Sequence, residues 1–213
     1  MIAVVDAGLG NLRSVAKALE ATGTLQPVRV TSDPAVVRDA ARVVVPGQGA
    51  FGDCASALGP EAPLGRAITD SIRGGKPYLG ICLGLQVLFE DSEESPGHPG
   101  LGVFRGHVRR LPTGMKDEND RRLKIPHIGW ARVAVRATHP VLDVPAADNW
   151  FYFVHSFHAL PEDQSLIAAI AAFGSLPLTA AIAHDNVVAV QYHPEKSQAA
   201  GLELLRQFVG WRC

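Results

Sequence analysis

The sequence lacks the features of membrane, nucleic-acid-binding and disulfide-rich proteins. Its 213 residues carry 20 Lys and Arg against 21 Asp and Glu, a formal net charge of −1. No basic surface for nucleic acid or a membrane is therefore expected. No apolar run approaches the ~20 residues that span a bilayer. The N-terminal run MIAVVDAGLGN has no positive region before it and ends at Asp6, which favours a first strand over a signal peptide.

Cysteine is also scarce. Cys54, Cys82 and Cys213 are far apart, and neither a CxxC pair nor a Cys/His zinc spacing occurs. Neither a disulfide framework nor a structural metal site is indicated. At 47% hydrophobic and 19% charged residues, the chain has enough apolar side chains for a substantial core. We expect a soluble, reduced, cytoplasmic protein that uses no metal and no cofactor.

Strand-type and helix-type segments alternate through the first half, which favours a parallel sheet covered by helices. Strands are predicted at 2–6, 27–31, 42–45 and 77–81, and helices at 11–22, after the turn 32–34, and at 64–73 and 83–89. The second half predicts β-ribbons at 109–135 and 150–159, a solvated charged loop at 115–124, a hairpin centred on 184–186 and a helix at 198–209. The expected fold is one α/β domain over residues 1–213, with a mixed, mostly parallel, flavodoxin-like sheet, flanking helices and an added antiparallel ribbon.

Cys82 is the candidate nucleophile. The stretch YLGICLGLQ places it between Gly80 and Gly84, at a strand-to-helix turn typical of a nucleophile elbow. We expect the two glycines to leave clearance for a substrate. The helix beginning at Leu83 offers free backbone N–H groups and a positive dipole end, which favour thiolate over thiol. A small buried core cysteine is the alternative on position alone.

A candidate base follows a later strand-like run, in QYHPE at 191–195. Proline after His193 favours an extended backbone at that residue. In an extended segment His193 and Glu195 share a face, so one ring nitrogen can bond Glu195 while the other meets a thiol. A surface turn is the alternative for an isolated His-x-Glu. The elbow cysteine favours the catalytic interpretation, because both groups would lie at carboxyl ends of strands.

Two glycine-rich segments follow strands. In PGQG, Gly47 and Gly49 allow a sharp turn that aims a backbone N–H, with Gln48 between them, at an oxyanion. The segment 8–13 resembles a dinucleotide fingerprint, but Arg13 stands where the third glycine belongs, so we reject a nucleotide site. His155 and His158 lie three apart in a strand-type run, on opposite faces, where core or edge positions are expected rather than metal binding.

The motifs GICLGLQ, QYHPE and PGQG, in this order, resemble the triad (class I) glutamine amidotransferases. The stretches DAGLGNLRSV, LFEDSEE, KIPHIGW, YFVHSFHA and QYHPEKS are similar to the glutaminase subunits of imidazole-glycerol-phosphate synthases, over nearly the whole chain. This resemblance implies that Cys82 attacks the carboxamide of glutamine, that His193 passes the proton to ammonia and that Glu195 orients His193. The implied oxyanion site comprises Gly47, Gln48, Gly49 and Leu83.

The resemblance also implies a substrate site and a partner. Gln86 and Glu94, with the backbone of Ser156 and Phe157, match positions that hold glutamine. Ammonia would pass to a separate (β/α)₈ cyclase subunit in a heterodimer, which makes imidazole glycerol phosphate and an aminoimidazole carboxamide ribotide for histidine biosynthesis. Positions of the subunit interface are matched by Asn11, Trp130 and Lys196.

Three residues depart from the family pattern, and two alternatives stay open. Gln48 replaces the usual valine, Ala7 a larger residue and Phe157 a frequent tyrosine; we expect Gln48 to alter regulation by the partner rather than the chemistry. One alternative is the glutaminase subunit of another synthase, such as that for pyridoxal phosphate, which KIPHIGW and HPEKS disfavour. The other is a non-catalytic binding or redox protein on the same scaffold, which would not need the His193–Glu195 pair.

Overall fold

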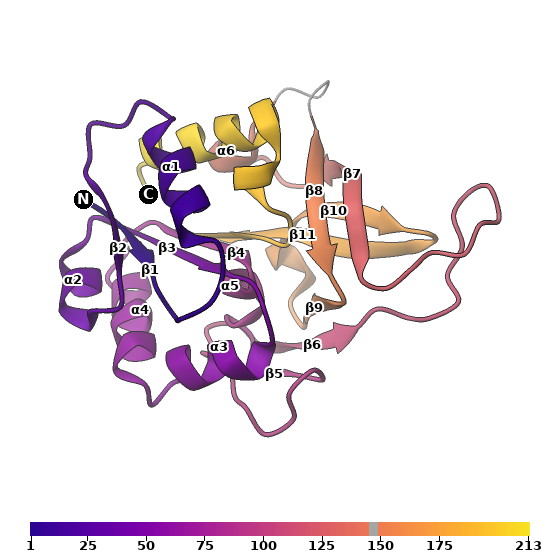
Figure 1. Ribbon diagram of the computed structural model, residues 1–213, viewed down its shortest axis with the longest axis horizontal. Coiled ribbons are helices and arrows are strands. Elements are labelled where there is room, and N and C mark those ends of the chain that lie inside the picture. The colour runs from indigo at the N-terminus through magenta and orange to yellow at the C-terminus, as the bar shows by residue number, and fades with distance from the viewer. Residues whose placement is uncertain (145–148) are drawn as a thin grey trace.

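A computed structural model describes residues 1–144 and 149–213. Its main feature is a nine-stranded mixed sheet in the order β2-β1-β3-β4-β12-β11-β10-β7-β8, beside a three-stranded sheet in the order β5-β6-β9 (Figure 1). The large sheet contains β1 (Ile2–Val5), β2 (Val28–Thr31), β3 (Arg42–Gly47), β4 (Tyr78–Cys82), β7 (His127–Val135), β8 (Trp150–His155), β10 (Ile167–Phe173), β11 (Leu176–His184) and β12 (Val187–Val190). The small sheet contains β5 (Asp91–Ser92), β6 (Gly106–Arg110) and β9 (Phe157–Pro161).

The half of the large sheet from β2 to β12 is parallel. Strands β1, β3, β4 and β12 are buried along their whole length, so their apolar runs need cover on both faces. Figure 1 shows α1 and α6 over one face and α2, α3 and α4 over the other. The helices are α1 (Leu12–Glu20), α2 (Pro34–Asp39), α3 (Phe51–Leu58), α4 (Pro63–Arg73), α5 (Leu83–Gln86) and α6 (Gln198–Gly210).

The half from β12 to β8 is antiparallel. The predicted hairpin at 184–186 is confirmed: β11 and β12 pair there, and Asp185 turns with φ 48°. The charged segment 115–124 is a largely exposed connection, in which Lys116 pairs with Asp120 and Asp117 with Arg121. Short 3-10 helices occupy Pro140–Leu142, Gln164–Leu166 and Pro194–Lys196. Among the described helices, none combines the length and apolar content that crossing a bilayer requires.

The structure corrects several boundaries. The predicted ribbon 150–159 is two strands, β8 and β9, separated by Ser156. Strand β8 belongs to the large sheet and β9 to the small one. The predicted ribbon 109–135 is strand only at its two ends, because the middle holds one isolated bridge between Lys116 and Arg122. The helix expected at 83–89 ends at Gln86. Helix α3 and strand β10 had no counterpart in the sequence-based prediction.

Candidate active site

Cys82 ends β4 at the carboxyl edge of the parallel half of the sheet. Gly47, the last residue of β3, is its register partner on one side, and Ile81 pairs with Val190 of β12 on the other. The backbone of Cys82 has φ 55° and ψ −102°, outside the regions that L-residues favour. Such a conformation costs about 1–3 kcal/mol and is typical of functional turns. The chain therefore turns sharply at the thiol and enters α5, as predicted for a nucleophile elbow.

The two glycines around Cys82 have a different purpose from the one expected. A Cβ at Gly84 would lie 1.8 Å from the carbonyl oxygen of Val45, and a Cβ at Gly80 would lie 2.3 Å from that of Gly84. Both positions therefore need glycine so that α5 can pack directly against β3 and β4. The prediction that these glycines clear space for substrate was wrong, because the space they leave is filled by backbone.

His193 and Glu195 form a buried pair beyond the end of β12. Nδ1 of His193 and Oε1 of Glu195 are 2.9 Å apart, and each side chain is 1% exposed. His193 is extended, as expected before proline, but Pro194–Lys196 is a 3-10 turn rather than a continued strand. The predicted pairing of His193 with Glu195 is therefore present, although a tight turn brings the carboxylate back to the ring.

The electrostatics of His193 suit a proton carrier. Burial by itself disfavours the charged ring, but the Cys82 thiol and the Glu195 carboxylate outweigh it and raise the pKa of His193 to about 9. Nε2 of His193 is buried and has no hydrogen-bond partner within the described parts of the chain. With Nδ1 held by Glu195, Nε2 is the ring nitrogen left for the thiol or for a leaving group.

The candidate oxyanion segment lies beside this pair. Gly49 has φ +123°, and a Cβ at Gly10 would lie 3.2 Å from the backbone nitrogen of Gln48. The segment 8–13, rejected as a nucleotide site, thus packs against the candidate oxyanion segment. The Gln48 side chain also reaches the pair, with its Nε2 3.4 Å from Nδ1 of His193. Leu83, the fourth residue of the predicted oxyanion site, follows Cys82 directly and begins α5.

A cavity of about 260 Å³ opens at the thiol. It is lined by Cys82 and by most of the residues expected to hold glutamine or an oxyanion, including Gln48, Gly49, Leu83, Gln86, Glu94, Ser156 and Phe157. Segments far apart in the sequence therefore meet at one site. A concave site with a few fixed polar groups is the form that small-molecule sites take.

The atoms available to a ligand in this cavity are restricted. The carbonyl oxygen of Phe157 already accepts hydrogen bonds from Nε2 of Gln86 at 3.0 Å and from Nδ1 of His155 at 2.9 Å. The carbonyl of Ser156 accepts from the backbone N–H of Leu111 at 2.9 Å. A carbonyl oxygen has two lone pairs, so the Phe157 carbonyl has no capacity left for a substrate donor.

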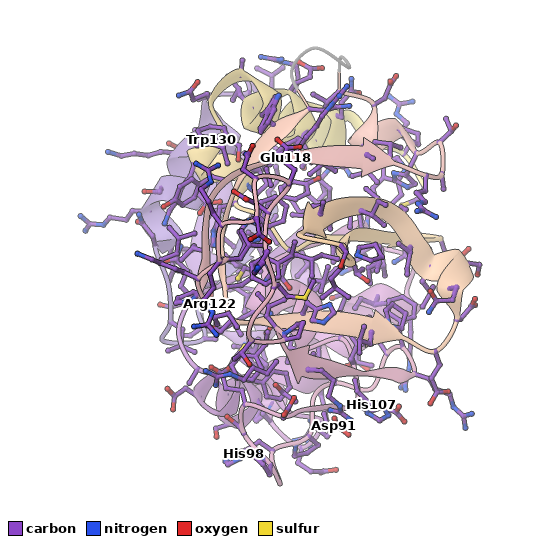
Figure 2. All side chains as sticks on the ribbon, turned by 90° about the vertical axis from the view of Figure 1, so that its right-hand side faces the viewer. Asp91, His98, His107, Glu118, Arg122 and Trp130 are labelled. Atoms are coloured by element: carbon purple, nitrogen blue, oxygen red, sulfur yellow. The ribbon has the colours of Figure 1, made fainter. Side chains whose placement is uncertain are left out.

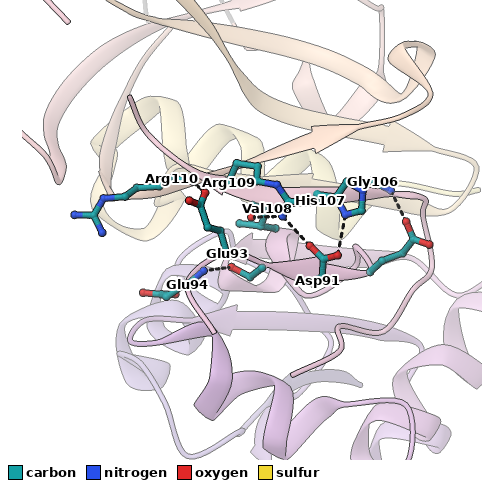
Figure 3. Close-up of polar contacts among 10 residues, drawn as sticks. Asp91, Glu93, Glu94, Gly106, His107, Val108, Arg109 and Arg110 are labelled. Atoms are coloured by element: carbon teal, nitrogen blue, oxygen red, sulfur yellow. Dashed lines mark hydrogen bonds and ion pairs between the residues drawn. The ribbon is translucent and has the colours of Figure 1, made fainter. Parts of the chain in front are cut away.

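Glu94 is held at the rim of the cavity by the small sheet. Its Oε2 accepts the backbone N–H of Phe51, at the start of α3, at 2.8 Å, and its own N–H donates to Ser92. Figure 3 shows the neighbouring anchors, in which Asp91 bonds both His107 and Arg109. Within residues 1–144 and 149–213, only one carboxylate oxygen of Glu94 has a hydrogen-bond partner, so the other is available to a ligand.

Gln191 was overlooked as an individual residue. It is fully buried, and its Nε2 lies 3.5 Å from Sγ of Cys82 while its Oε1 accepts from Nε2 of Gln86 at 3.1 Å. The only sequence signal was its place in QYHPE, directly after a strand-like run. A buried amide there must find partners, but the sequence does not reveal that one of them is the thiol.

The three residues assigned to a partner interface lie on the surface near the carboxyl edge of the parallel strands, where Cys82 is located. Trp130 of β7 is 44% exposed and meets Tyr152 edge-on, and the Lys196 ammonium lies 5.9 Å from the centre of the same tyrosine ring. Asn11 is exposed and caps α1 through a bond from Ser14. Figure 2 shows Trp130 and the Asp91–His107 pair at opposite ends of one face.

Two of the seven remaining histidines, His155 and His158, are buried, and the other five are partly or fully exposed. His155 and His158 are buried as expected, but they belong to different strands, so the assignment to two faces of one strand was wrong. Burial lowers the pKa of His155 to about 3, so its ring is neutral. Away from the cavity, Glu90, His107 and Glu162 bring ligand-type atoms within 4.8 Å of one another, a set at the surface that could hold a metal ion.

This chain is similar to known proteins along its whole length. The family model described as glutamine amidotransferase class-I matches residues 3–210. The chain belongs to the class I glutamine amidotransferase family. Proteins named imidazole glycerol phosphate synthase subunit HisH are similar over their full length. That of Nitrosospira multiformis is 50% identical over 99% of this chain and 98% of its own, and that of Aromatoleum aromaticum is 47% identical over the same shares.

Solved structures share the fold. A crystal structure of a glutamine amidotransferase superposes with a TM-score of 0.69 at 18% identity, covering 99% of both chains. The structure of PurLQS from Thermotoga maritima gives a TM-score of 0.67 at 17% identity, covering 98% of this chain and 96% of the other. The predicted fold class, an α/β amidotransferase with a mixed sheet, is confirmed.

Proposed function

We propose that this chain is the glutaminase subunit of an imidazole-glycerol-phosphate synthase, acting in histidine biosynthesis. It hydrolyses glutamine to glutamate and ammonia. One observation supports this most: Cys82, in a strained turn at the end of β4, lies close enough to a buried His193 to help raise the pKa of its ring, and Nδ1 of that ring is bonded to Glu195. This is a nucleophile, a base and an orienting acid, which acyl transfer requires. The full-length similarity to HisH subunits supplies the reaction context.

In the first half of the reaction, the Cys82 thiolate attacks the carboxamide carbon of glutamine. The thiol proton resides on Nε2 of His193, and Glu195 holds the ring by Nδ1. The carbonyl oxygen becomes an oxyanion, for which backbone N–H groups among Gly47, Gln48, Gly49 and Leu83 are the donors that we assign. His193 then protonates the nitrogen as the C–N bond breaks. Ammonia departs, and a γ-glutamyl thioester remains on Cys82.

In the second half, water attacks the thioester carbon. His193 takes a proton from the water and returns it to the sulfur, so glutamate leaves and the thiol is restored. We assign the binding of glutamine to Gln86, Glu94, Ser156 and Phe157. The uncommitted oxygen of Glu94 suits the α-ammonium group. Because the Phe157 carbonyl already accepts two hydrogen bonds, Phe157 would hold glutamine through other atoms, whereas the Ser156 carbonyl accepts one and keeps a second lone pair for a substrate donor.

Ammonia is used elsewhere, in a separate (β/α)₈ cyclase subunit that forms a heterodimer with this chain. There it would enter the ribonucleotide that is split into imidazole glycerol phosphate and aminoimidazole carboxamide ribotide. Exposed Trp130 and Lys196, with Asn11, lie near the active-site edge of the sheet and suit this docking surface. We take residues 1–213 as one amidotransferase domain. Its three free thiols suit a reducing compartment, so we place it in the cytoplasm.

The test measures ammonia release from glutamine by this chain alone, and then with the cyclase and its ribonucleotide ligand. We expect low activity alone and a large rise with the liganded partner. Cys82→Ala in the complex should abolish glutamine-dependent synthesis while synthesis from added ammonium salt continues. Loss of both would contradict ammonia transfer between subunits. A wild-type complex that releases no ammonia would favour another synthase or the non-catalytic alternative.

A further inference from the structure

A continuous line of hydrogen bonds joins the backbone of β9 to the nucleophile. From the Phe157 carbonyl it passes to Nε2 of Gln86 at 3.0 Å, on to Oε1 of Gln191 at 3.1 Å, and from Nε2 of Gln191 to Sγ of Cys82 at 3.5 Å. Gln86 is 3% exposed and Gln191 is fully buried. Because both amides are buried, these bonds satisfy polar groups that would otherwise lack partners, and the fold thereby fixes the line.

The direction of every bond in this line follows from its first member. The Phe157 carbonyl can only accept, so Gln86 must turn its NH₂ group toward it. The same NH₂ group reaches Gln191, which must therefore present its oxygen. The other end of the Gln191 amide, its NH₂ group, then necessarily points at Cys82. A flipped Gln191 would place two NH₂ groups together and turn an oxygen toward the sulfur.

We propose that Gln191 is a positioning residue that donates a hydrogen bond to the Cys82 sulfur and stabilises the thiolate, and that Gln86 acts through it by fixing the orientation of its amide. The inference rests on the proposed function, in which Cys82 is the nucleophile. A donor to a charged acceptor is stronger than a donor to a neutral one, so this bond favours thiolate over thiol. The same bond restricts rotation of the Cys82 side chain about χ1. It thereby keeps the sulfur directed at the cavity that Gln86 also lines.

Gln86 thereby gains a second purpose beside the glutamine contact assigned above. Its NH₂ group is committed to Phe157 and Gln191, which leaves only its oxygen for substrate. His155 shares the Phe157 carbonyl and, with its neutral ring donating from Nδ1, closes the far end of the line. Because Gln86 and Phe157 both line the cavity, occupation of the substrate site and the state of the thiol are linked through one amide.

The test is the pH dependence of Cys82 alkylation by iodoacetamide in the full chain, followed by peptide mass spectrometry. Near-isosteric Gln191→Met removes the donor, and the pH at which alkylation is half-maximal should rise by about one unit, a roughly tenfold loss of reactive thiolate below the midpoint. Gln86→Met should give a smaller rise. In a Gln191→Met background, Gln86→Met should add nothing, because its effect passes through Gln191.

Two controls separate positioning from general damage. Gln207→Met removes a half-buried amide that bonds Glu203 in α6, far along the chain from Cys82, and should leave the midpoint unchanged. Exposed Cys213, in the same samples, should alkylate identically in all variants. An unchanged midpoint in a folded Gln191→Met protein, or a Gln86→Met shift that persists in that background, overturns the proposal. If Gln191→Met does not fold, an unchanged midpoint in Gln86→Met overturns it instead.

The assay needs no glutamine, so its result is independent of the proposed function. A shifted midpoint in a chain that never releases ammonia would leave the Gln191–Cys82 bond intact and remove the glutaminase assignment. An unshifted midpoint in an active glutaminase would overturn the role of Gln191 and leave the glutaminase assignment intact.

Discussion

Replacing Glu195 by Gln should change the stability of the protein in a pH-dependent way. His193 has a pKa of about 9 in the folded chain, against 6.5 for a free imidazole. A pKa difference of about 2.5 corresponds to about 3 kcal/mol of preference for the charged ring, at about 1.36 kcal/mol for each pH unit. Burial lowers this pKa, and the Cys82 thiol and the Glu195 carboxylate raise it by more than burial lowers it. We therefore assign roughly half of the preference, about 1.5 kcal/mol, to Glu195.

The sign follows from the direction of the shift. Because the folded pKa lies above the unfolded one, the stabilisation is fully present below pH 6.5 and disappears as the pH rises through 9. Glu195→Gln should therefore cost about 1.5 kcal/mol more at pH 6 than at pH 10. The assay is guanidinium unfolding of both proteins at these pH values, with an NMR titration of the His193 ring.

Glu203→Gln is the matched control, because Glu203 pairs with its neighbours on α6, Arg206 and Gln207. Its effect on stability should not follow the titration of His193. The reasoning is refuted if the difference between wild type and Glu195→Gln is the same at pH 6 and pH 10, or if the ring titrates near 9 in both.

Three further predictions concern packing, docking and regulation. Gly84→Ala should destabilise the protein by roughly 3 kcal/mol in chemical unfolding, since its Cβ would meet the Val45 carbonyl, whereas Gly210→Ala, with open space, should not. Lys196→Ala should weaken binding or activation by the cyclase, measured by calorimetry and ammonia release, and unchanged values would remove it from the interface. Gln48→Val keeps the backbone N–H at position 48. Ammonia release by the liganded complex should therefore fall far less than the roughly 100-fold expected for the loss of an oxyanion donor. A loss of that size would refute a purely regulatory role for Gln48.

The sequence was most informative where local chemistry decides the structure. All five parallel strands, the elbow at Cys82 and the His193–Glu195 pair were predictable. Buried parallel strands are continuous apolar runs, and a strand-to-helix turn needs small neighbours. The same reasoning explains the hairpin at Asp185, where a short turn joins two β-type runs.

Long-range contacts decided what could not be predicted. The break at Ser156 occurs because the residues before it pair in the large sheet and the residues after it pair in the small sheet. Gly80 and Gly84 were recognised as unusual, but the clash with Val45 that explains them involves another strand. The turn at Pro194 and the amide of Gln191 likewise acquire their roles only when β12 lies beside β4. A pattern in one segment carries no information about the neighbour across the sheet.

The most direct test of the central claim is the reaction of the chain, in complex with its cyclase, with an electrophilic analogue of glutamine. Mass spectrometry of the peptides then locates the adduct. We predict one adduct per chain, on Cys82 alone, with protection by glutamine. An adduct on Cys54 or Cys213, or labelling of Cys82 that glutamine does not slow, would contradict the assignment of Cys82 as the nucleophile of a glutaminase.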